Sequence, residues 1–315
     1  MDLSDIDLAR RSLALFGHTG ALRKVATGLD STYRVKTAGG RVFALRIASG
    51  IPFRRASAFA VEAEWIDALA NNPWFDIPRV QRTENGQLAG RILDADGNAR
   101  ASTLLSWLPG RRRFQPNPTN ARLLGRATGA LHLHAQTAGP PPVGAIKAWD
   151  AKLMCLMPKR TEEALGRIAP EGVEPVQRIF AGLQRTVAKL NSTEMGLINA
   201  DLGLHNVLWH KGQIGLVDFN DSGVGPYAFC LARLVARIRL HQQDQALIDE
   251  LLRGYREVTP LPCVYEQWGD LFELAADAFS LNYGAGRALR RGVSLREHEQ
   301  RIMHTLDERL KRLDL

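Results

Sequence analysis

Three polar residues in one short stretch have the types and the spacing that phosphoryl-transfer chemistry needs. Asp201 is followed five residues later by Asn206, and Asp218 comes after a turn and a short apolar run. Carboxylate and amide oxygens suit Mg²⁺, and a further carboxylate can accept the proton of an attacking hydroxyl. Residues 197–223 therefore predict a site where a phosphoryl group is transferred with the help of a divalent cation.

The residues between these groups predict a hairpin that brings them together. Residues 207–210 and 214–219 are strand-like apolar runs, and the segment 210–213, His-Lys-Gly-Gln, has the composition of a turn. Pairing of the two runs would carry Asp218 to the place where Asp201 and Asn206 point. We therefore expect all three side chains to face one pocket.

After a short helix at the N-terminus, the first ~110 residues have the periodicity of a mostly antiparallel sheet with one helix. A glycine pair at 39–40 marks a hairpin turn. The expected strands cover 21–27, 33–38, 41–48, 79–82 and 101–108, and the expected helices cover 5–17 and 57–72.

The pattern changes to that of helices after Pro109 and Gly110. Apolar residues at helical spacing predict helices over 118–137 and 172–194, and residues 227–315 are helical throughout. A small β lobe (1–108) followed by a larger helical lobe (109–315) is an α+β plan with two domains.

The chemical motif resembles the catalytic and metal-binding loops of the aminoglycoside phosphotransferase and choline-kinase-like superfamily. In these relatives of protein kinases, a His-Gly-Asp-x-x-x-x-Asn loop is followed by Asp-Phe-Gly or Asp-Phe-Asp-Asp. The resemblance implies a two-lobe protein-kinase-like fold with a nucleotide-binding β lobe. It also implies that Asp201 is the catalytic base and that Asn206 and Asp218 are the Mg²⁺ ligands.

The same resemblance implies which residues of the β lobe hold ATP. They are Gly28 and Ser31 in a phosphate-covering loop, Arg46 on the third strand, Glu62 as its helix partner, and Ser106 and Leu108 in the hinge that would take the adenine. Arg46 stands where protein kinases have a lysine, and it keeps the charge while adding a planar fork. Glu64 is the alternative to Glu62, but it lies on a different face of the expected helix.

The chain departs from the family pattern around the expected base. Asn199 stands in place of the histidine, and Ala200 in place of the glycine that follows it. Cys230 stands where the family has an aspartate that anchors the catalytic loop. Residues 218–221, Asp-Phe-Asn-Asp, are similar to the Asp-Phe-Asp-Asp branch of small-molecule kinases.

These observations predict an ATP- and Mg²⁺-dependent phosphotransferase that moves the γ-phosphoryl group to a hydroxyl of a small molecule. One alternative is a protein Ser/Thr kinase on the same scaffold, although no long activation segment follows Asp218. Another is a nucleotide-binding regulator without turnover, which Asn199 and Cys230 motivate. The acceptor stays open, because the acids of the C-terminal region, which would suit a polycation, are interleaved with arginines.

Charge and composition favour a cytoplasmic protein with neither nucleic acid nor membrane as partner. The 315 residues carry a net charge of +8, and the one tight basic cluster, 111–113, is expected to be a solvated loop. His132 and His134 diverge on a helix, which argues against a shared metal. The three cysteines are widely spaced, as in a protein of a reducing compartment, and no stretch has the ~20 apolar residues of a membrane span.

Overall fold

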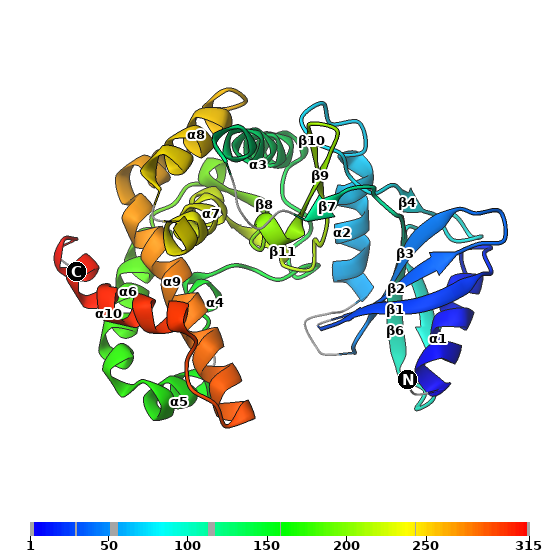
Figure 1. The fold of residues 1–315 in the computed structure, drawn as a ribbon, viewed down its shortest axis with the longest axis horizontal. Coiled ribbons are helices and arrows are strands. Elements are labelled where there is room, and N and C mark those ends of the chain that lie inside the picture. The colour runs from blue at the N-terminus through cyan, green and yellow to red at the C-terminus, as the bar shows by residue number, and fades with distance from the viewer. Residues whose placement is uncertain are drawn as a thin grey trace. The chain divides into compact units, whose positions relative to one another are not determined.

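The computed structural model describes residues 3–28, 30–50, 56–112, 117–157, 159–242 and 244–313, and its elements are drawn in Figure 1. The chain packs into two compact units. Unit 1 comprises Met1–Phe114, Pro141–Lys147 and His205–Asn220, and unit 2 comprises Gln115–Pro140, Ala148–Leu204 and Asp221–Leu315. Both units are made of several separate segments of the chain. The predicted boundary between a β lobe and a helical lobe at residues 108 and 109 stays a prediction.

Unit 1 is built on a six-stranded antiparallel sheet. Its strand order is β1-β2-β3-β6-β4, and β5 also pairs with β6. The strands are β1 (Ala21–Thr27), β2 (Asp30–Lys36), β3 (Val42–Ala48), β4 (Val80–Gln81), β5 (Gly90–Leu93) and β6 (Ala99–Ser106). The antiparallel sheet is as predicted, but β5 was not expected and β2 begins three residues earlier than the sequence indicated.

Two helices cover the two faces of this sheet, α1 (Leu3–Ala14) and α2 (Ala56–Ala68) (Figure 1). Successive side chains of a strand point to opposite faces. Leu45 and Ile47 of β3 therefore pack into the core beneath α1, together with Leu13. Arg46, between them in sequence, points to the face covered by α2. The alternation of β3 thus places one charged side chain inside unit 1.

A second, three-stranded sheet of unit 1 carries the chemical motif. Its order is β10-β9-β7, with β7 (Arg111–Arg112), β9 (Val207–His210) and β10 (Gln213–Leu216). The predicted hairpin is present. Lys211 and Gly212 between its strands both have positive φ, 47° and 80°, as a tight two-residue turn requires. Arg111 and Arg112 form a strand that pairs with β9 and not the expected loop, but both are exposed to solvent, as expected. Arg113 lies outside the described residues.

Unit 2 is mainly helical, as predicted, and it contains one two-stranded ribbon that the sequence did not indicate. The ribbon pairs β8 (Met195–Asn199) with β11 (Ser222–Pro226). The helices are α3 (Pro118–Ala138), α4 (Ala151–Met154), α5 (Lys159–Ile168), α6 (Val173–Val187), α7 (Tyr227–Gln242), α8 (Gln245–Arg256), α9 (Cys263–Arg291) and α10 (Glu297–Lys311). Short 3₁₀ turns lie at Pro170–Gly172, Ser192–Glu194 and Leu204–Asn206.

The helix expected over 172–194 ends at Val187 as α6. The chain then turns at Asn191, whose side-chain oxygen accepts a hydrogen bond from the Thr193 amide at 3.0 Å. Asparagine offers the backbone this local alternative to a helix. The turn starts β8, which leads directly to Asp201.

Helices α3 and α8 pack at a crossing that only glycine permits. A Cβ on Gly125 would lie 1.9 Å from the Leu251 carbonyl oxygen, and one on Gly254 would lie 2.0 Å from that of Arg122. Close approach also buries His132 of α3 completely, where its Nδ1 lies 2.8 Å from the hydroxyl of Tyr255. His132 is therefore a core histidine.

Burial gives His132 a predictable effect on stability. It lowers the pKa of this imidazole to about 3, whereas an unfolded histidine titrates near ~6.5. Below that pH the unfolded chain binds a proton that the folded chain does not, so the free energy of unfolding falls as the pH drops from 6.5 towards 3. At pH 5 the expected loss from this group is about 2 kcal/mol.

Denaturant unfolding between pH 4 and 7 checks this expectation. In His132→Gln the loss on acidification should be smaller than in the wild type by about that amount. His304→Gln, at an exposed position of α10, should follow the wild type. A His132→Gln curve parallel to that of the wild type would contradict the assignment.

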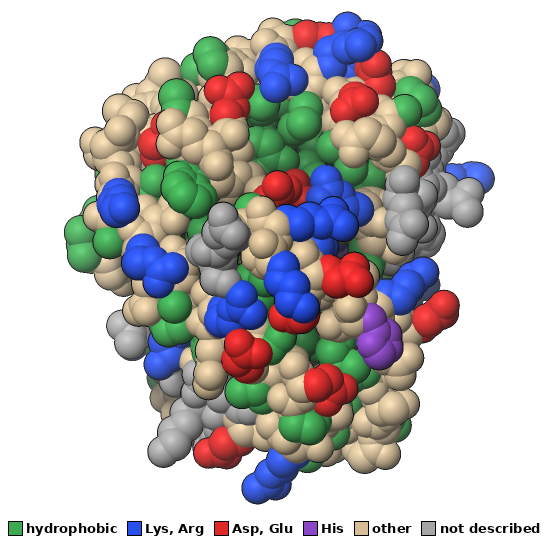
Figure 2. Space-filling model, turned by 90° about the vertical axis from the view of Figure 1, so that its left-hand side faces the viewer, with side chains coloured by type: hydrophobic (Ala, Val, Ile, Leu, Met, Phe, Trp, Pro, Cys, Tyr) green, Lys and Arg blue, Asp and Glu red, His purple; other side chains and the backbone are tan. Residues whose placement is uncertain are grey.

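Three further observations concern membrane-spanning helices, surface charge and the cysteines. Within the described residues, no helix is long and apolar enough to cross a membrane. On the face drawn in Figure 2, lysine and arginine side chains are interspersed with aspartate and glutamate side chains, so the charge there forms no patch of a single sign. All three cysteines are free thiols, and Cys155 and Cys230 are buried.

Candidate active site

The centre of the site in unit 1 is the buried guanidinium of Arg46. Its Nη2 lies 2.9 Å from Oδ2 of Asp30, and its Nη1 donates to Oε1 of Glu62. All three residues are at most 6% exposed. Glu62 on α2 is thus the partner of Arg46, while Glu64 is exposed. Asp30 was not expected as a partner, although its place at the start of β2, next to Ser31, puts it beside β3.

The charge of Asp218 also acts on Arg46. Burial by itself lowers the pKa of the Arg46 guanidinium, but the carboxylates of Glu62, Asp30 and Asp218 outweigh burial and raise it. Arg46 is therefore permanently charged. Because three carboxylates act on one guanidinium, the cluster has an excess of negative charge.

Removing Arg46 should cost a large part of the stability of unit 1. Arg46→Ala leaves the carboxylates of Asp30 and Glu62 buried without their cation, and such a change typically costs about 3–5 kcal/mol. Arg82→Ala is the matched control, because the ion pair of Arg82 with Asp67 is largely exposed and is worth less than about 1 kcal/mol. Urea unfolding of the two variants measures the difference. Equal losses would show that the buried cluster contributes little.

The β9–β10 hairpin of the second sheet places Asn206 and Asp218 at its open end, opposite the turn. Val207 at the start of β9 is paired with Leu216 at the end of β10. One step further out, the carbonyl of Asn206 accepts a hydrogen bond from the Val217 amide at 3.0 Å. Asp218 follows directly, two residues beyond the end of β10. The hairpin thus brings Asn206 and Asp218 to the same end of this sheet, as the sequence predicted. That their side chains face one pocket stays a prediction.

Asp218 has an unusual backbone, and its neighbour holds it in place. Its φ of 65° is left-handed, which is uncommon for residues other than glycine and recurs at functional sites. Phe219 is buried and meets Trp65 of α2 edge-on, with ring centroids 5.4 Å apart. Trp65 lies one helical turn after Glu62, so one face of α2 contacts both Arg46 and the Asp218 segment. Trp65 was not among the residues predicted from the sequence, although its i, i+3 spacing from Glu62 was an available signal.

Backbone hydrogen bonds and strand pairing define the local structure at the expected hinge and phosphate loop. The backbone amide and the hydroxyl of Ser106 are both engaged by Arg79, at 2.8 Å each. Leu108 forms no backbone–backbone hydrogen bond with another described residue. Ser31 lies within β2, paired with Thr27 and Ile47, so it is a strand residue and not a loop residue. Gly28 donates its amide to the Asp30 carbonyl at 3.1 Å.

Asp201 belongs to unit 2, where residues of β8 and α7 hold its loop. Its amide donates to the side-chain oxygen of Asn199 at 3.1 Å. The carbonyl of Asn199 in turn accepts from the thiol of Cys230 at 3.3 Å. Burial is the main cause that raises the pKa of this thiol to about 12, so it stays a donor. Asn199 and Cys230, two of the departures from the family pattern, therefore contact each other and tie the Asp201 turn to α7.

Two arginines of α7 bind the carboxylate of Asp201. Nη2 of Arg237 lies 2.6 Å from Oδ1 of Asp201, and Nη2 of Arg233 lies 3.4 Å from the same oxygen. Neither arginine was among the residues predicted from the sequence. Their i, i+4 spacing on a helix just after the motif was the only local sign.

The donor set in unit 1 fits a divalent cation that a nucleotide helps to bind. No group of three or more His, Cys, Asp or Glu side chains that could hold a metal occurs within the described residues. A closed protein cage is therefore absent from that part of the chain. One carboxylate and one amide beside an excess of negative charge suit Mg²⁺, which usually keeps waters and takes its remaining ligands from substrate phosphates.

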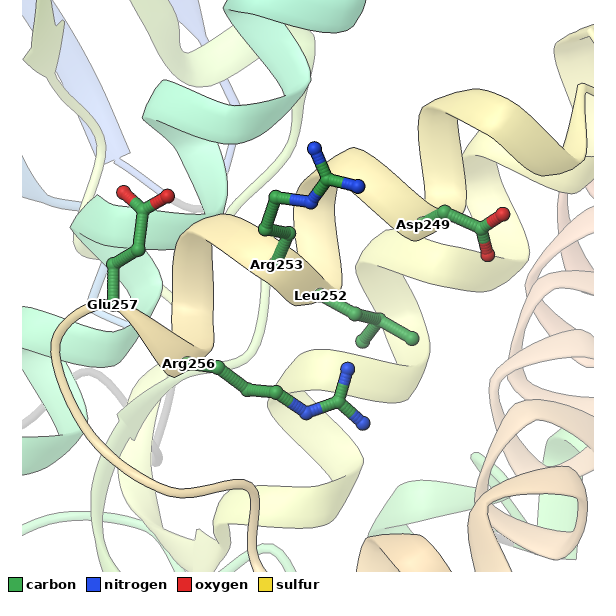
Figure 3. A pocket seen from close by; sticks show the side chains of 5 residues that line it. All are labelled: Asp249, Leu252, Arg253, Arg256 and Glu257. Carbon is green, nitrogen blue, oxygen red and sulfur yellow. The ribbon is translucent and has the colours of Figure 1, made fainter.

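A hollow of about 480 Å³ on unit 2 is lined by none of the predicted site residues. It runs along α8 and is lined by Asp249, Leu252, Arg253, Arg256 and Glu257 (Figure 3). Its charged side chains spread outwards from one helix and do not converge on a common point. This hollow offers no chemistry that competes with the site around Arg46 or Asp201.

Solved structures similar to this chain are kinases. The amicoumacin kinase hAmiN, in complex with AMP-PNP, Ca²⁺ and Ami, has a TM-score of 0.78 at 18% identity, over 98% of this chain and 94% of that one. A microcompartment-associated aminopropanol kinase has a TM-score of 0.77 at 21% identity, over 98% of both chains. A putative fructosamine-3-kinase from Thermobifida fusca reaches 0.62 at 17% identity, over 98% of this chain and 100% of that one. At these identities the likeness shows the fold, and it confirms the predicted kinase-like fold class.

The family follows from the sequence itself. No curated protein matches it, but the model of the phosphotransferase enzyme family matches residues 21–266, which include every predicted site residue. The protein therefore belongs to the phosphotransferase enzyme family, and it is an enzyme of the kinase class.

Proposed function

We propose that this protein transfers the γ-phosphoryl group of ATP to a hydroxyl of a small molecule, with Mg²⁺ as the cofactor. The observation that carries the proposal is the buried cluster of Arg46, Asp30 and Glu62, on which Asp218 acts electrostatically. A fixed cation next to an acidic metal site is what binding of a metal-bound triphosphate requires. The amicoumacin kinase that is similar in fold is described in complex with AMP-PNP and Ca²⁺, which supports a nucleotide and a divalent cation here.

Each predicted residue has a role in this proposal. Asn206 and Asp218 hold the cation, whose charge offsets that of the phosphates. Arg46, fixed by Glu62 and Asp30, pairs with phosphate oxygens. The backbone next to Ser106 and that of Leu108 take the adenine, and Gly28 and Ser31 lie along the phosphates.

Asp201 is the proposed base. As the acceptor oxygen forms its bond to the γ-phosphorus and the bond to the leaving ADP oxygen breaks, the carboxylate of Asp201 takes the hydroxyl proton. Asp201 belongs to unit 2, whereas Asn206 and Asp218 belong to unit 1. That all three act at one cation is therefore proposed here from the predicted roles of the residues.

Small molecules are favoured over a protein as the acceptor. Between Asp218 and α7 lie only eight residues, and five of them form β11, paired with β8. A protein kinase needs an activation segment at this place to hold a peptide. The proteins similar in fold are described as an amicoumacin kinase, an aminopropanol kinase and a putative fructosamine-3-kinase, which supports a small acceptor.

A screen of hydroxyl compounds tests the proposal. Purified protein with Mg²⁺ and ATP should release ADP only with some acceptors, and EDTA should stop the release. The product should carry one phosphate, seen as a mass increase of the acceptor. If the protein binds ATP but releases ADP with none of the hydroxyl compounds, the alternative of a nucleotide-binding regulator without turnover is favoured.

A further inference from the structure

The two arginines that bind Asp201 have no part in the phosphoryl transfer proposed above. We propose that Arg237 and Arg233 form an anion-binding site beside Asp201, so that the acceptor carries a carboxylate or phosphate group close to the hydroxyl that is phosphorylated. The inference rests on the proposed function, and it specifies the class of acceptor.

The guanidinium groups have donors left over. Each arginine uses Nη2 towards Oδ1 of Asp201. The other terminal nitrogen, Nη1, is buried in both residues and has no hydrogen-bond partner within the described part of the chain. A buried charged donor without an acceptor is costly. An anionic group on the acceptor would satisfy both nitrogens.

Arg233 is held rigidly in the fold. It is 5% exposed, and its guanidinium carbon lies 4.2 Å from the ring centre of Phe279 and 5.8 Å from those of Trp149 and Phe229. Burial, followed by the charge of Arg237, lowers its pKa to about 10, so it is still charged at neutral pH. Arg237 is less enclosed, with a side chain 30% exposed. A fixed buried cation therefore lies beside one whose side chain is partly open to solvent.

The shared guanidinium sets where the anion lies on the acceptor. One guanidinium can hold two carboxylates, one on each part of its planar fork. If Arg237 holds Asp201 with Nη2 and the acceptor with Nη1, the anionic group and the hydroxyl at Asp201 are only a few bonds apart. A small hydroxy acid or a phosphorylated polyol has this form.

Charge also disfavours the opposite class of acceptor. Two guanidiniums lie within 3.4 Å of one carboxylate oxygen of Asp201, and the carboxylate of Asp221, which also acts on Arg233, offsets part of their charge. An ammonium group placed at Nη1 of either arginine would be repelled by the positive guanidinium. It also could not accept a hydrogen bond from the N–H groups of Nη1. Polycationic aminoglycosides therefore suit this position poorly.

Matched acceptors test the inference on the full-length protein. Each small hydroxy acid is compared with its primary amide, and each polyol phosphate with the free polyol, by kcat/KM for ADP release. We expect kcat/KM to be at least ~10-fold higher for the anionic member of one series. That series identifies the group as a carboxylate or a phosphate.

Variants separate anion binding from a positioning role of Arg237. In Arg237→Gln the ratio of kcat/KM for the anionic acceptor to that for its neutral counterpart should fall to about one. Arg237→Lys should keep part of the wild-type ratio. Arg253→Gln, which removes an exposed arginine of α8, should keep the wild-type preference. If Arg237→Gln lowers kcat/KM equally for the acid and the amide, Arg237 only positions Asp201 and the inference is wrong.

Binding measurements separate this inference from the proposed function. Calorimetric titration of the same acids and amides into protein that contains Mg²⁺ and AMP-PNP needs no turnover. Tighter binding of the anion, lost in Arg237→Gln, supports the anion site even if no acceptor is phosphorylated. Phosphorylation of neutral or cationic acceptors without any preference for anions would overturn the inference and leave the proposed function intact. Failure of every anion both to bind and to react would also overturn it.

Discussion

Replacing Asp218 by Asn should abolish turnover and weaken metal-dependent nucleotide binding by ~10²-fold or more. The substitution removes the carboxylate that the cation needs and keeps the size of the side chain. Asparagine also tolerates the left-handed backbone that Asp218 adopts, at φ 65°. The change therefore tests the charge of the side chain without adding backbone strain, which Asp218→Ala would do.

Nucleotide affinity measured at several Mg²⁺ concentrations checks this prediction. The wild type should bind ATP more tightly as Mg²⁺ is added, and Asp218→Asn should lose that dependence. Asp96→Asn is the control, because Asp96 is exposed in a turn of the same unit. Unchanged Mg²⁺-dependent binding in Asp218→Asn would show that the cation lies elsewhere.

Replacing Asp201 by Asn should lower kcat by ~10²-fold or more and leave ATP affinity nearly unchanged. The amide can still accept a hydrogen bond from Arg237, but it cannot take the proton of the acceptor hydroxyl. Because Asp201 belongs to unit 2, which lacks Arg46 and Asp218, its loss should not disturb the residues that hold the nucleotide.

Single-turnover measurements with saturating ATP report the chemical step directly. Asp249→Asn on α8, where the exposed Asp249 accepts a hydrogen bond from Gln245, is the control and should react like the wild type. The two variants together separate the roles, since Asp218→Asn should lose binding and Asp201→Asn should lose rate. Equal rates for wild type and Asp201→Asn would argue against the base and for a protein whose purpose is to bind nucleotide.

The sequence by itself determined the class of fold and the chemical motif. Period-two alternation in 41–48 was enough to predict β3, and the turn around Gly212 was enough to predict the hairpin that carries Asn206 and Asp218. These features depend on neighbours in the chain, because strand and turn geometry follow from local residue types. The motif was also sufficient for the family, since few other sites need these oxygens at this spacing.

Only the tertiary structure decided which charged residues meet. Asp30 was visible next to Ser31, yet its role depends on the register that places β2 beside Arg46. In the same way, Arg233 and Arg237 reach Asp201 because β8 packs near α7, more than thirty residues along the chain. Local patterns carry no information about such pairs, since an ion pair forms between whichever side chains the packed faces bring together. For this protein, residue types thus defined the reaction class, whereas the packed faces determine which charges surround the proposed base.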